Sequence, residues 1–259
     1  FMAGFSGGRK AICPGIVSLD GVRNFHGFDF LSNPKASNAN LDMNPLHLEA
    51  LSIAKSAGVD FSLNLILDSE RRIAAAFAGE LESAHLEAVK LVRIHSCRKV
   101  EKQSDLVITS SGGYPLDAVF YQCVKGMVSC LPAVKPRGVI IAVGECREGV
   151  GSPEYEGLMR ENSSDWIKFL SDIRRPGYYK KDQWQLQMQC RVLEKVGRDN
   201  IRFFSSGISK ETLNCLGING FSGSSKEIKK QIQDSVQKSI ASGLSISIFP
   251  EGPYSVPIE

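Results

Sequence analysis

Short apolar runs alternate with longer segments of helical periodicity along this chain of 259 residues. The short runs have the length and the boundaries of strands. They span Phe61–Leu67, Ile73–Phe77, Leu106–Thr109, Val139–Val143, Ile201–Phe204 and Leu244–Phe249. The helical segments span Pro45–Ser56, Leu81–Ser96, Leu116–Leu131, Lys180–Val196 and Lys226–Ala241. Such alternation predicts an α/β fold.

Two of these helical segments place their apolar residues on one face. The first stripe consists of Ile228, Ile232, Val236 and Ile240, and the second of Leu116, Phe120, Cys123, Met127 and Leu131. Residues three or four positions apart lie on the same side of a helix. We therefore expect both helices to pack against a sheet.

A charged stretch without strand character, Cys97–Gln103, separates two sets of elements. It predicts a domain boundary, with residues 1–98 as a truncated α/β cofactor domain and residues 99–259 as a second domain. The order of elements in the second domain predicts a doubly wound, mostly parallel sheet flanked by helices. A return of the last strand and tail to the first domain remains an alternative. The unusual start at Phe1 and Met2 suggests that an upstream segment has been removed.

Composition narrows the classes of partner. The 31 basic and 28 acidic residues are spread along the chain and give a net charge of +3, so a nucleic-acid-binding surface is not expected. No apolar run is long enough to span a membrane and no secretory signal is present, which predicts a cytoplasmic protein. The seven cysteines lack a CxxC pair, so we expect reduced and mostly buried thiols.

The opening segment contains a first candidate for chemistry. Gly7 and Gly8 precede Arg9 and Lys10, which is typical of a backbone that approaches an anion closely. The spacing of a Walker A loop is missing, and Ala11 stands where that loop has a hydroxyl. From composition alone, a glycine turn with two solvated cations is the better interpretation.

Histidine provides a second candidate. His26 follows Lys10 by sixteen residues and lies between Phe25 and Phe28. Its imidazole suits nickel, zinc or copper, but no second ligand lies at a suitable spacing, so a metal would need other donors. A lone histidine is more often structural. His85 and His95 fall on the apolar stripe of their helix and are expected to be core residues.

A third candidate follows the first strand of the second domain. Ser110–Gly113 is expected to place free N–H groups at the carboxyl edge of the sheet. On the next helix, Gln122 and Lys125 share one face and could hold a carboxylate, although spacing alone favours a solvated polar face. Trp184 shares a stripe with the apolar residues four and eight positions later, which favours core packing.

Several local patterns occur together and in order. They are Gly7-Gly8-Arg9-Lys10-Ala11-Ile12-Cys13-Pro14-Gly15, Asn44-Pro45-Leu46-His47, Ala78-Gly79-Glu80 with His85, Ser110-Ser111-Gly112-Gly113-Tyr114-Pro115-Leu116-Asp117, and Gln122-x-x-Lys125-Gly126-Met127. Together they resemble the lactate racemase family of nickel-pincer nucleotide enzymes.

The resemblance implies a role for particular residues. Lys10 would bind the nickel-pincer nucleotide covalently through a thioamide, beside Gly7 and Gly8. His26 would be the metal ligand, with the cofactor supplying the other donors. The catalytic residues on the substrate side would be Gln122 and Lys125, near the substrate carboxylate, with Trp184 as a third, less secure match.

The resemblance also implies an activity. The full-length protein would be a racemase or epimerase of a 2-hydroxy acid such as lactate, acting by transient hydride transfer to the cofactor. Its partners would be this small substrate and the proteins that make the cofactor. The family's base histidines and a substrate arginine lie upstream of the lysine segment and have no counterpart here. We therefore expect this chain to be inactive as given.

Two other hypotheses remain open. A non-catalytic α/β homologue that binds an anion or a nucleotide would explain the lack of base histidines. A phosphate-handling enzyme that uses Gly7, Gly8 and Lys10 is less well supported, because no acidic magnesium site accompanies them.

Overall fold

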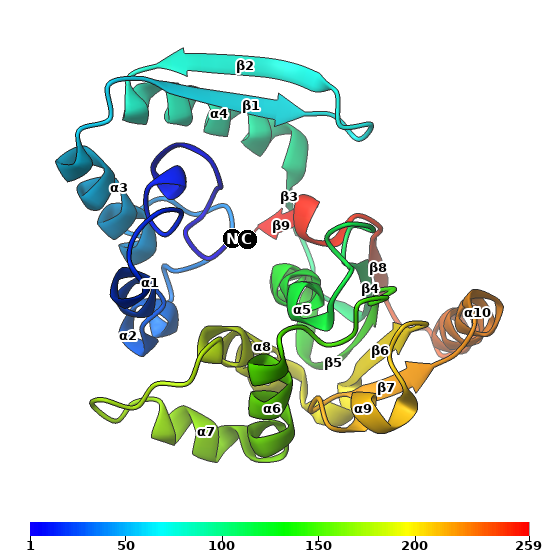
Figure 1. The fold of residues 1–259 in the computed structure, drawn as a ribbon. Coiled ribbons are helices and arrows are strands. Elements are labelled where there is room, and N and C mark those ends of the chain that lie inside the picture. Colours follow the sequence, from blue (N-terminus) through cyan, green and yellow to red (C-terminus); the bar gives the residue numbers. More distant parts are fainter. Residues whose placement is uncertain (259) are drawn as a thin grey trace. The chain divides into compact units, whose positions relative to one another are not determined.

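The computed structural model describes residues 1–258. The chain divides into two compact units, Phe1–Cys97 and Arg98–Glu259, each with its own secondary structure (Figure 1). The units are described one after the other below.

The first unit is mainly helical and contains one antiparallel hairpin. Its helices are η1 (Gly8–Ala11), α1 (Leu19–Phe25), α2 (Phe28–Ser32), α3 (Pro45–Ala57) and α4 (Leu81–Ser96), and its strands are β1 (Ser62–Leu67) and β2 (Ile73–Gly79). Helix α3 begins as its residues dictate. The side chain of Asn44 accepts from the amides of Leu46 and His47, and Pro45 occupies the first turn, where its missing N–H costs nothing.

The hairpin lies over α4 (Figure 1), and the inward row of β1 consists of Ser62, Asn64 and Ile66. Asn64 is the buried residue of β1, whereas Leu63 and Leu65 are 61% and 48% exposed. Both apolar runs were correctly predicted as strands, but an apolar row would ordinarily face a core. Here the inward positions lie against η1 and α4, and Asn64 is held there by a hydrogen bond to the amide of Gly8.

The second unit is built on a five-stranded parallel sheet. Its strands are β4 (Ser104–Ser110), β5 (Val134–Val143), β6 (Ile201–Ser205), β7 (Asn219–Ser222) and β8 (Ile246–Phe249), in the order β7-β6-β5-β4-β8. All four neighbouring pairs are parallel. Helices α5 (Phe120–Ser129) and α8 (Gln183–Val196) pack on one face, and α10 (Ser225–Ala241) packs on the other (Figure 1). The predicted doubly wound, mostly parallel architecture is confirmed.

Successive residues of the strands point to opposite faces. Phe203 meets the ring of Phe120 on the α5 face, with the ring centroids 5.0 Å apart, while Phe204 packs with Ile228 of α10. The predicted stripe of α10 contacts the sheet only at its beginning. The predicted packing of this helix on the sheet is confirmed at Ile228 and Ile232, whereas Ile240, at the far end, is 64% exposed.

Helix α8 is buried on nearly every side although it contains four glutamines, at positions 183, 185, 187 and 189. The amide of Gln185 donates to the carbonyl of Tyr121, and that of Gln189 donates to the carbonyl of Leu216. An interior helix can bury such polar side chains when they bond to backbone groups that would otherwise lack a partner.

The remaining elements of the second unit are short. They are β3 (Cys97–Lys99), which begins at the unit boundary and pairs with β9 (Val256–Ile258), the helices α6 (Pro153–Asn162), α7 (Trp166–Asp172) and α9 (Lys210–Asn214), and the single turns η2 (Leu131–Ala133), η3 (Ser163–Asp165), η4 (Arg198–Asn200) and η5 (Gly252–Tyr254). In the part of the chain that the structure describes, no helix is both long and apolar enough to cross a membrane.

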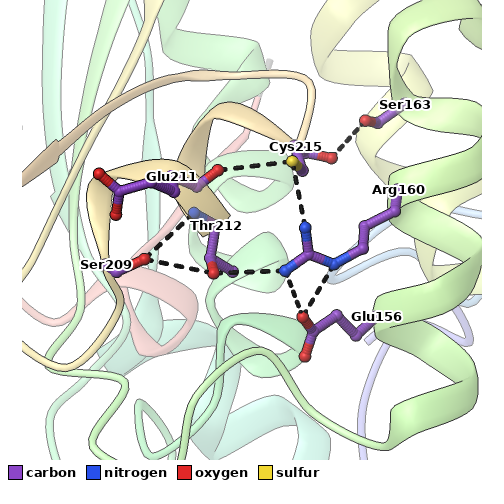
Figure 2. Close-up of polar contacts among 7 residues, drawn as sticks. All are labelled: Glu156, Arg160, Ser163, Ser209, Glu211, Thr212 and Cys215. Atoms are coloured by element: carbon purple, nitrogen blue, oxygen red, sulfur yellow. Dashed lines mark hydrogen bonds and ion pairs between the residues drawn. The ribbon is translucent and has the colours of Figure 1, made fainter.

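Arg160 connects α6 to α9 (Figure 2). Its guanidinium donates to the carboxylate of Glu156 at 2.6 Å, and also to Thr212 Oγ1 and Cys215 Sγ at 3.3 Å each.

The six cysteines other than Cys215 are buried, in agreement with the expected reduced interior thiols.

All six predicted strands and all five predicted helices are present. The main error lies in α5, which begins at Phe120 rather than at Leu116, because the residues before it form turns. Strand β7 was missed because Asn219 and Gly220 interrupt its apolar pattern.

Shortening the side chain of Phe203 should destabilise the second unit strongly. Phe203 is fully buried between the sheet and α5, so Phe203→Ala removes apolar contacts and leaves a cavity. We expect a loss of about 3–5 kcal/mol in the free energy of unfolding, measured by urea denaturation. Ile240→Ala is the matched control and should change it by less than about 0.5 kcal/mol. Equal effects would contradict the assigned core.

Cys215 should react first with a thiol reagent. It is partly exposed, whereas the other six thiols are buried. A brief treatment of the native protein with iodoacetamide, followed by peptide mapping, should label Cys215 before the rest. The rapid phase should vanish in Cys215→Ser, and rapid labelling of a buried cysteine in the native protein would show that the packing is wrong.

Candidate functional sites

Arg9 is fully buried in the first unit, at 1% exposure. Its Nη2 donates to the carbonyls of Ala3 and Phe5 at 2.7 and 3.3 Å, and its Nη1 lies 2.8 Å from Nε2 of His85. The same Nε2 lies 3.0 Å from the carbonyl oxygen of Ser6, so this ring nitrogen contacts both a donor and an acceptor. The interpretation of Arg9 as a solvated cation was therefore wrong: its side chain ties the opening segment to α4.

The glycines before Arg9 allow this close approach. Gly7 and Gly8 both have positive φ angles, of 80° and 51°. A Cβ added to Gly8 would lie 2.8 Å from the side chain of His85, so no larger residue fits without displacing α4. The amide of Gly8 donates to Oδ1 of Asn64 at 2.8 Å. This amide thus already has an acceptor within the protein and does not serve as a donor to an anion.

Lys10 follows in the same short turn and is half-buried. Burial and, to a smaller extent, the charge of Arg9 lower the pKa of its amine. Both effects favour the uncharged amine, which has a lone pair for nucleophilic attack. Lys10 is thus better suited to covalent chemistry than a solvated surface lysine.

His26 ends α1, and the structure places it within electrostatic range of Lys10. Burial lowers the pKa of its imidazole to about 4, and the charge of Lys10 acts in the same direction. Nδ1 lies 3.1 Å from the carbonyl of Val22, which can only accept, so Nδ1 carries the proton. The lone pair of the neutral ring is then on Nε2, as a metal ligand requires.

The three other histidines differ in their surroundings. His47 and His85 are buried, and burial followed by the charge of Arg9 lowers the pKa of each to about 4. His85 is a core residue, as predicted. His95 is exposed near the end of α4, so its assignment to the core was wrong. The apolar stripe of α4 turns away from the core in its last turns.

A cavity of about 450 Å³ lies beside the opening segment. Gly7, Gly8, Asn64 and His85 are among the residues that line it. Lys10 and His26 do not line this cavity. The first unit therefore places the two glycines and the side chains of Lys10 and His26 in different surroundings.

In the second unit, the residues before α5 pair with a loop. Cys146 and Glu148 donate to the carbonyls of Asp117 and Ala118, and the amides of Phe120 and Tyr121 donate to the carbonyls of Gly149 and Val150. The residue before α5, Val119, provides no side-chain cap. The amides of Phe120 and Tyr121 at this helix terminus are thus already bonded. Within Ser110–Gly113, the segment predicted to present free N–H groups, the amide of Gly112 donates to Oγ of Ser110 at 3.0 Å.

Asp117 fixes the position of the same loop. Its Oδ2 accepts from the amide of Glu145 at 3.0 Å, and its own carbonyl accepts from Cys146 at 2.8 Å. The side chain is buried, and Oδ1 accepts no hydrogen bond within residues 1–258. The start of α5 is therefore held by side-chain and backbone contacts together.

Gln122 and Lys125 lie in the first two turns of α5, each partly buried. Oε1 of Gln122 is enclosed and has no hydrogen-bond donor among the described residues. A buried acceptor without a donor is unusual in a folded protein and suits a ligand that brings one. The two residues share one helix and differ by three positions, as predicted.

Trp184 contacts this part of α5 through Tyr121. Its indole nitrogen donates to Tyr121 Oη at 2.7 Å, and burial raises the pKa of that phenol to about 12. Tyr121 was missed in the sequence analysis because a tyrosine beside the apolar stripe gives no signal of its own.

A second cavity, of about 540 Å³, is lined by Asp117, Glu145 and Lys229 among others, but not by Gln122, Lys125 or Trp184.

No set of three or more histidine, cysteine, aspartate or glutamate side chains within residues 1–258 is arranged to hold a metal. A metal bound through His26 would need donors from a ligand. Arg9 and Asn64 were also missed as organising residues. A polar residue in an apolar strand was the available signal for Asn64, but nothing in the sequence distinguished a buried Arg9 from a solvated one.

Comparison with known proteins gives matches along much of the chain. The model of the lactate racemase C-terminal domain matches residues 99–252, and that of the N-terminal domain matches residues 1–39. The lactate racemase of Thermoanaerobacterium thermosaccharolyticum is 41% identical over 195 residues, 74% of this chain and 45% of the relative. That of Lactiplantibacillus plantarum is 30% identical over 258 residues, 97% of this chain and 58% of the relative. The chain spans about half the length of these curated relatives.

Solved structures agree with these matches. The lactate racemase apoprotein from T. thermosaccharolyticum has a TM-score of 0.85 and 33% identity, and the match covers 100% of this chain and 60% of that chain. A crystal structure of a Thermotoga maritima protein has a TM-score of 0.64 at 18% identity, covering 85% of this chain and 57% of that chain. The second match shows a shared fold alone.

Stability of the first unit should fall as the solution becomes acidic. The pKa values of His47 and His85 are about 4 in the folded state and about 6.5 when unfolded, so between these values the unfolded chain binds more protons. The free energy of unfolding is therefore highest above about pH 6.5 and falls as the pH decreases toward 4. Each of the two rings lowers it by up to about 1.4 kcal/mol per pH unit.

Urea denaturation at pH 7.5 and pH 5.0 measures this effect. His85→Gln should reduce the difference between the two urea midpoints, because it removes one histidine whose pKa is lowered in the folded state. His95→Gln, a change at an exposed residue of the same helix, should leave the difference unaltered. An identical pH dependence in wild type and His85→Gln would refute the assignment.

Proposed function

Because the chain belongs to the lactate racemase family, we propose that it forms part of a racemase or epimerase of a small 2-hydroxy acid such as lactate. The protein would use a nickel-pincer nucleotide, attached to Lys10 and with its metal bound to His26. Proteins that make this cofactor would be its partners. The first unit would carry the cofactor residues, and the second would carry residues for the substrate.

The observation that supports this proposal most strongly is the pairing of Lys10 with His26. An amine whose pKa is lowered and a neutral imidazole lie within electrostatic range of one another, although sixteen residues separate them. The amine suits attachment through an amide-like bond, and the imidazole suits a soft or borderline metal. No ion pair joins the Lys10 amine to a carboxylate among the described residues.

The donor set also fits the proposed cofactor. His26 would offer one ligand through Nε2, and no protein-only metal cluster is present within residues 1–258. A group that brings its own donors is what such a site requires. When bound, the cofactor would supply an acceptor for the α-hydrogen of the substrate, which no ordinary side chain can remove as hydride.

On the substrate side, Lys125 would bind the carboxylate through a charge-assisted hydrogen bond. Gln122 would orient the same molecule, because its enclosed Oε1 needs a donor and a substrate hydroxyl can provide one. Trp184 would act through Tyr121, whose hydroxyl it holds at 2.7 Å, and so keep the face of α5 in place. We assign the transfer of the hydroxyl proton to no residue of this chain.

A non-catalytic homologue is the second candidate. It is favoured by one observation, that the amides of Gly8, Phe120 and Tyr121 are already bonded within the fold. Such segments are stable structural turns whether or not a cofactor is present. The two candidates differ in a covalent modification of Lys10.

To test the proposal, the protein is produced from the complete reading frame that encodes this chain, together with the cofactor-making enzymes. Peptide mapping should find a mass adduct on Lys10, metal analysis should find nickel, and chiral chromatography should show interconversion of D- and L-lactate. Lys10→Arg should lack the adduct and racemisation, since a guanidinium is a poor nucleophile. His26→Asn should keep the adduct but lose most of the nickel.

Further variants separate the substrate residues from the cofactor residues. Lys125→Met should keep both the adduct and nickel while raising KM on the order of tenfold or more, because the carboxylate loses its charged partner. Lys238→Arg, on the exposed part of α10, is the control and should behave as wild type. A folded protein without adduct, nickel or racemisation would favour the non-catalytic homologue.

A further inference from the structure

We propose that Arg9 is a positioning residue that prepares Lys10 for acylation, by fixing the turn that presents the amine and by placing a second, uncompensated cation beside it. The inference rests on the proposed role of Lys10 as the covalent anchor. It assigns a function to a side chain that does not itself contact the cofactor or the substrate.

The geometry of Arg9 is that of a residue held in place from three directions. Its guanidinium bonds to the carbonyls of Ala3 and Phe5 and to Nε2 of His85, at distances of 2.7, 3.3 and 2.8 Å. These contacts connect the first residues, the turn η1 and helix α4. Because Arg9 and Lys10 are consecutive in that turn, movement of Arg9 would displace the backbone of Lys10.

The charge of Arg9 is unusual for a buried residue. Buried guanidinium groups are ordinarily paired with a carboxylate. No ion pair to Arg9 occurs in the part of the chain that the structure describes, and its contacts are two carbonyls and a neutral ring. Burial lowers the pKa of Arg9 to about 10, so the group remains charged at neutral pH. Its field is therefore not cancelled locally.

Lys10 lies in that field. The charged and titratable side chains that act on it or are acted on by it are the guanidinium of Arg9 and the imidazole of His26. Burial and, to a smaller extent, the charge of Arg9 lower the pKa of Lys10. No carboxylate within residues 1–258 forms an ion pair with the Lys10 amine, so nothing of that kind offsets Arg9.

This environment affects one defined chemical step. Only the uncharged amine has a lone pair with which to attack the carbon of an acyl or thioacyl donor. A bond forms from Nζ to that carbon, the bond to the leaving group breaks with its electron pair, and the surplus proton on nitrogen passes to water. A larger uncharged fraction at neutral pH speeds the step in proportion.

Acetylation with N-acetoxysuccinimide tests the proposal on the whole chain without the cofactor. The protein is treated briefly between pH 6.5 and pH 10, and peptide mapping gives the rate at each lysine. The pH midpoint, unlike the absolute rate, does not depend on how accessible the amine is. Lys10 should reach half of its maximal rate at a lower pH than Lys238, an exposed reference on α10.

Arg9→Gln should move the midpoint of Lys10 to higher pH and lower its rate at pH 8 by at least about threefold, because one nearby positive charge is lost. Arg9→Lys, which keeps a charge, should stay closer to wild type. Asn64→Ala removes the hydrogen bond to the amide of Gly8 in the same turn but removes no charge. It should lower the melting temperature and leave the pH midpoint of Lys10 unchanged.

Two results would overturn the inference. One is a wild-type midpoint for Lys10 equal to or above that of Lys238, which needs no variant and so does not depend on how well Arg9→Gln folds. The other is a folded Arg9→Gln whose midpoint moves no further from that of wild type than the midpoint of Asn64→Ala does. The assay uses neither nickel nor lactate. A missing cofactor adduct with a normal acetylation profile would therefore count against the proposed function alone.

Discussion

A buried backbone amide or carbonyl must find a hydrogen-bond partner, and both candidate sites are held in place by this requirement. In the first unit, Asn64 accepts from the amide of Gly8 and Arg9 donates to two carbonyls of the opening segment. In the second, Asp117 and the loop of residues 145–150 satisfy the groups at the start of α5. The chain thus uses buried polar side chains and paired loops to fix turns that glycine alone would leave mobile.

In the first unit, the use of a buried arginine to bind carbonyls has electrostatic consequences. A guanidinium that bonds to carbonyls keeps its positive charge, whereas one that pairs with a carboxylate is largely neutralised. The charge of Arg9 contributes to the lowered pKa values of Lys10, His47 and His85, and that of Lys10 contributes to the lowered pKa of His26. Amine and imidazole are both shifted toward their uncharged forms, in which lone pairs are available. A structural solution for a tight turn therefore also makes the neighbouring side chains chemically competent.

Periodicity was sufficient to predict the elements but not which way they face. The runs Phe61–Leu67 and Ile73–Phe77 are strands, yet the leucines of β1 point outward because the inward row carries Asn64. Alternation reveals two faces of a strand without identifying which one meets the core. The predicted start of α5 was wrong for a related reason. Leu116 continues the apolar stripe, but Asp117 and Ala118 pair with a distant loop through their carbonyls, and the helix begins only at Phe120.

The site residues show the same division between local and tertiary information. Gln122 and Lys125 lie one helical turn apart because spacing within a helix is a local property. The proximity of Lys10 to His26 and the burial of Arg9 depend on how η1, α1 and α4 pack together, which no single segment encodes. Family resemblance could single out Lys10 and His26 as candidates because it carries tertiary information indirectly. It could not identify Arg9 as an organising residue, since its role is visible only when the contacts of its guanidinium are known. The surroundings of a reactive side chain thus hold as much of the mechanism as the reactive atom itself.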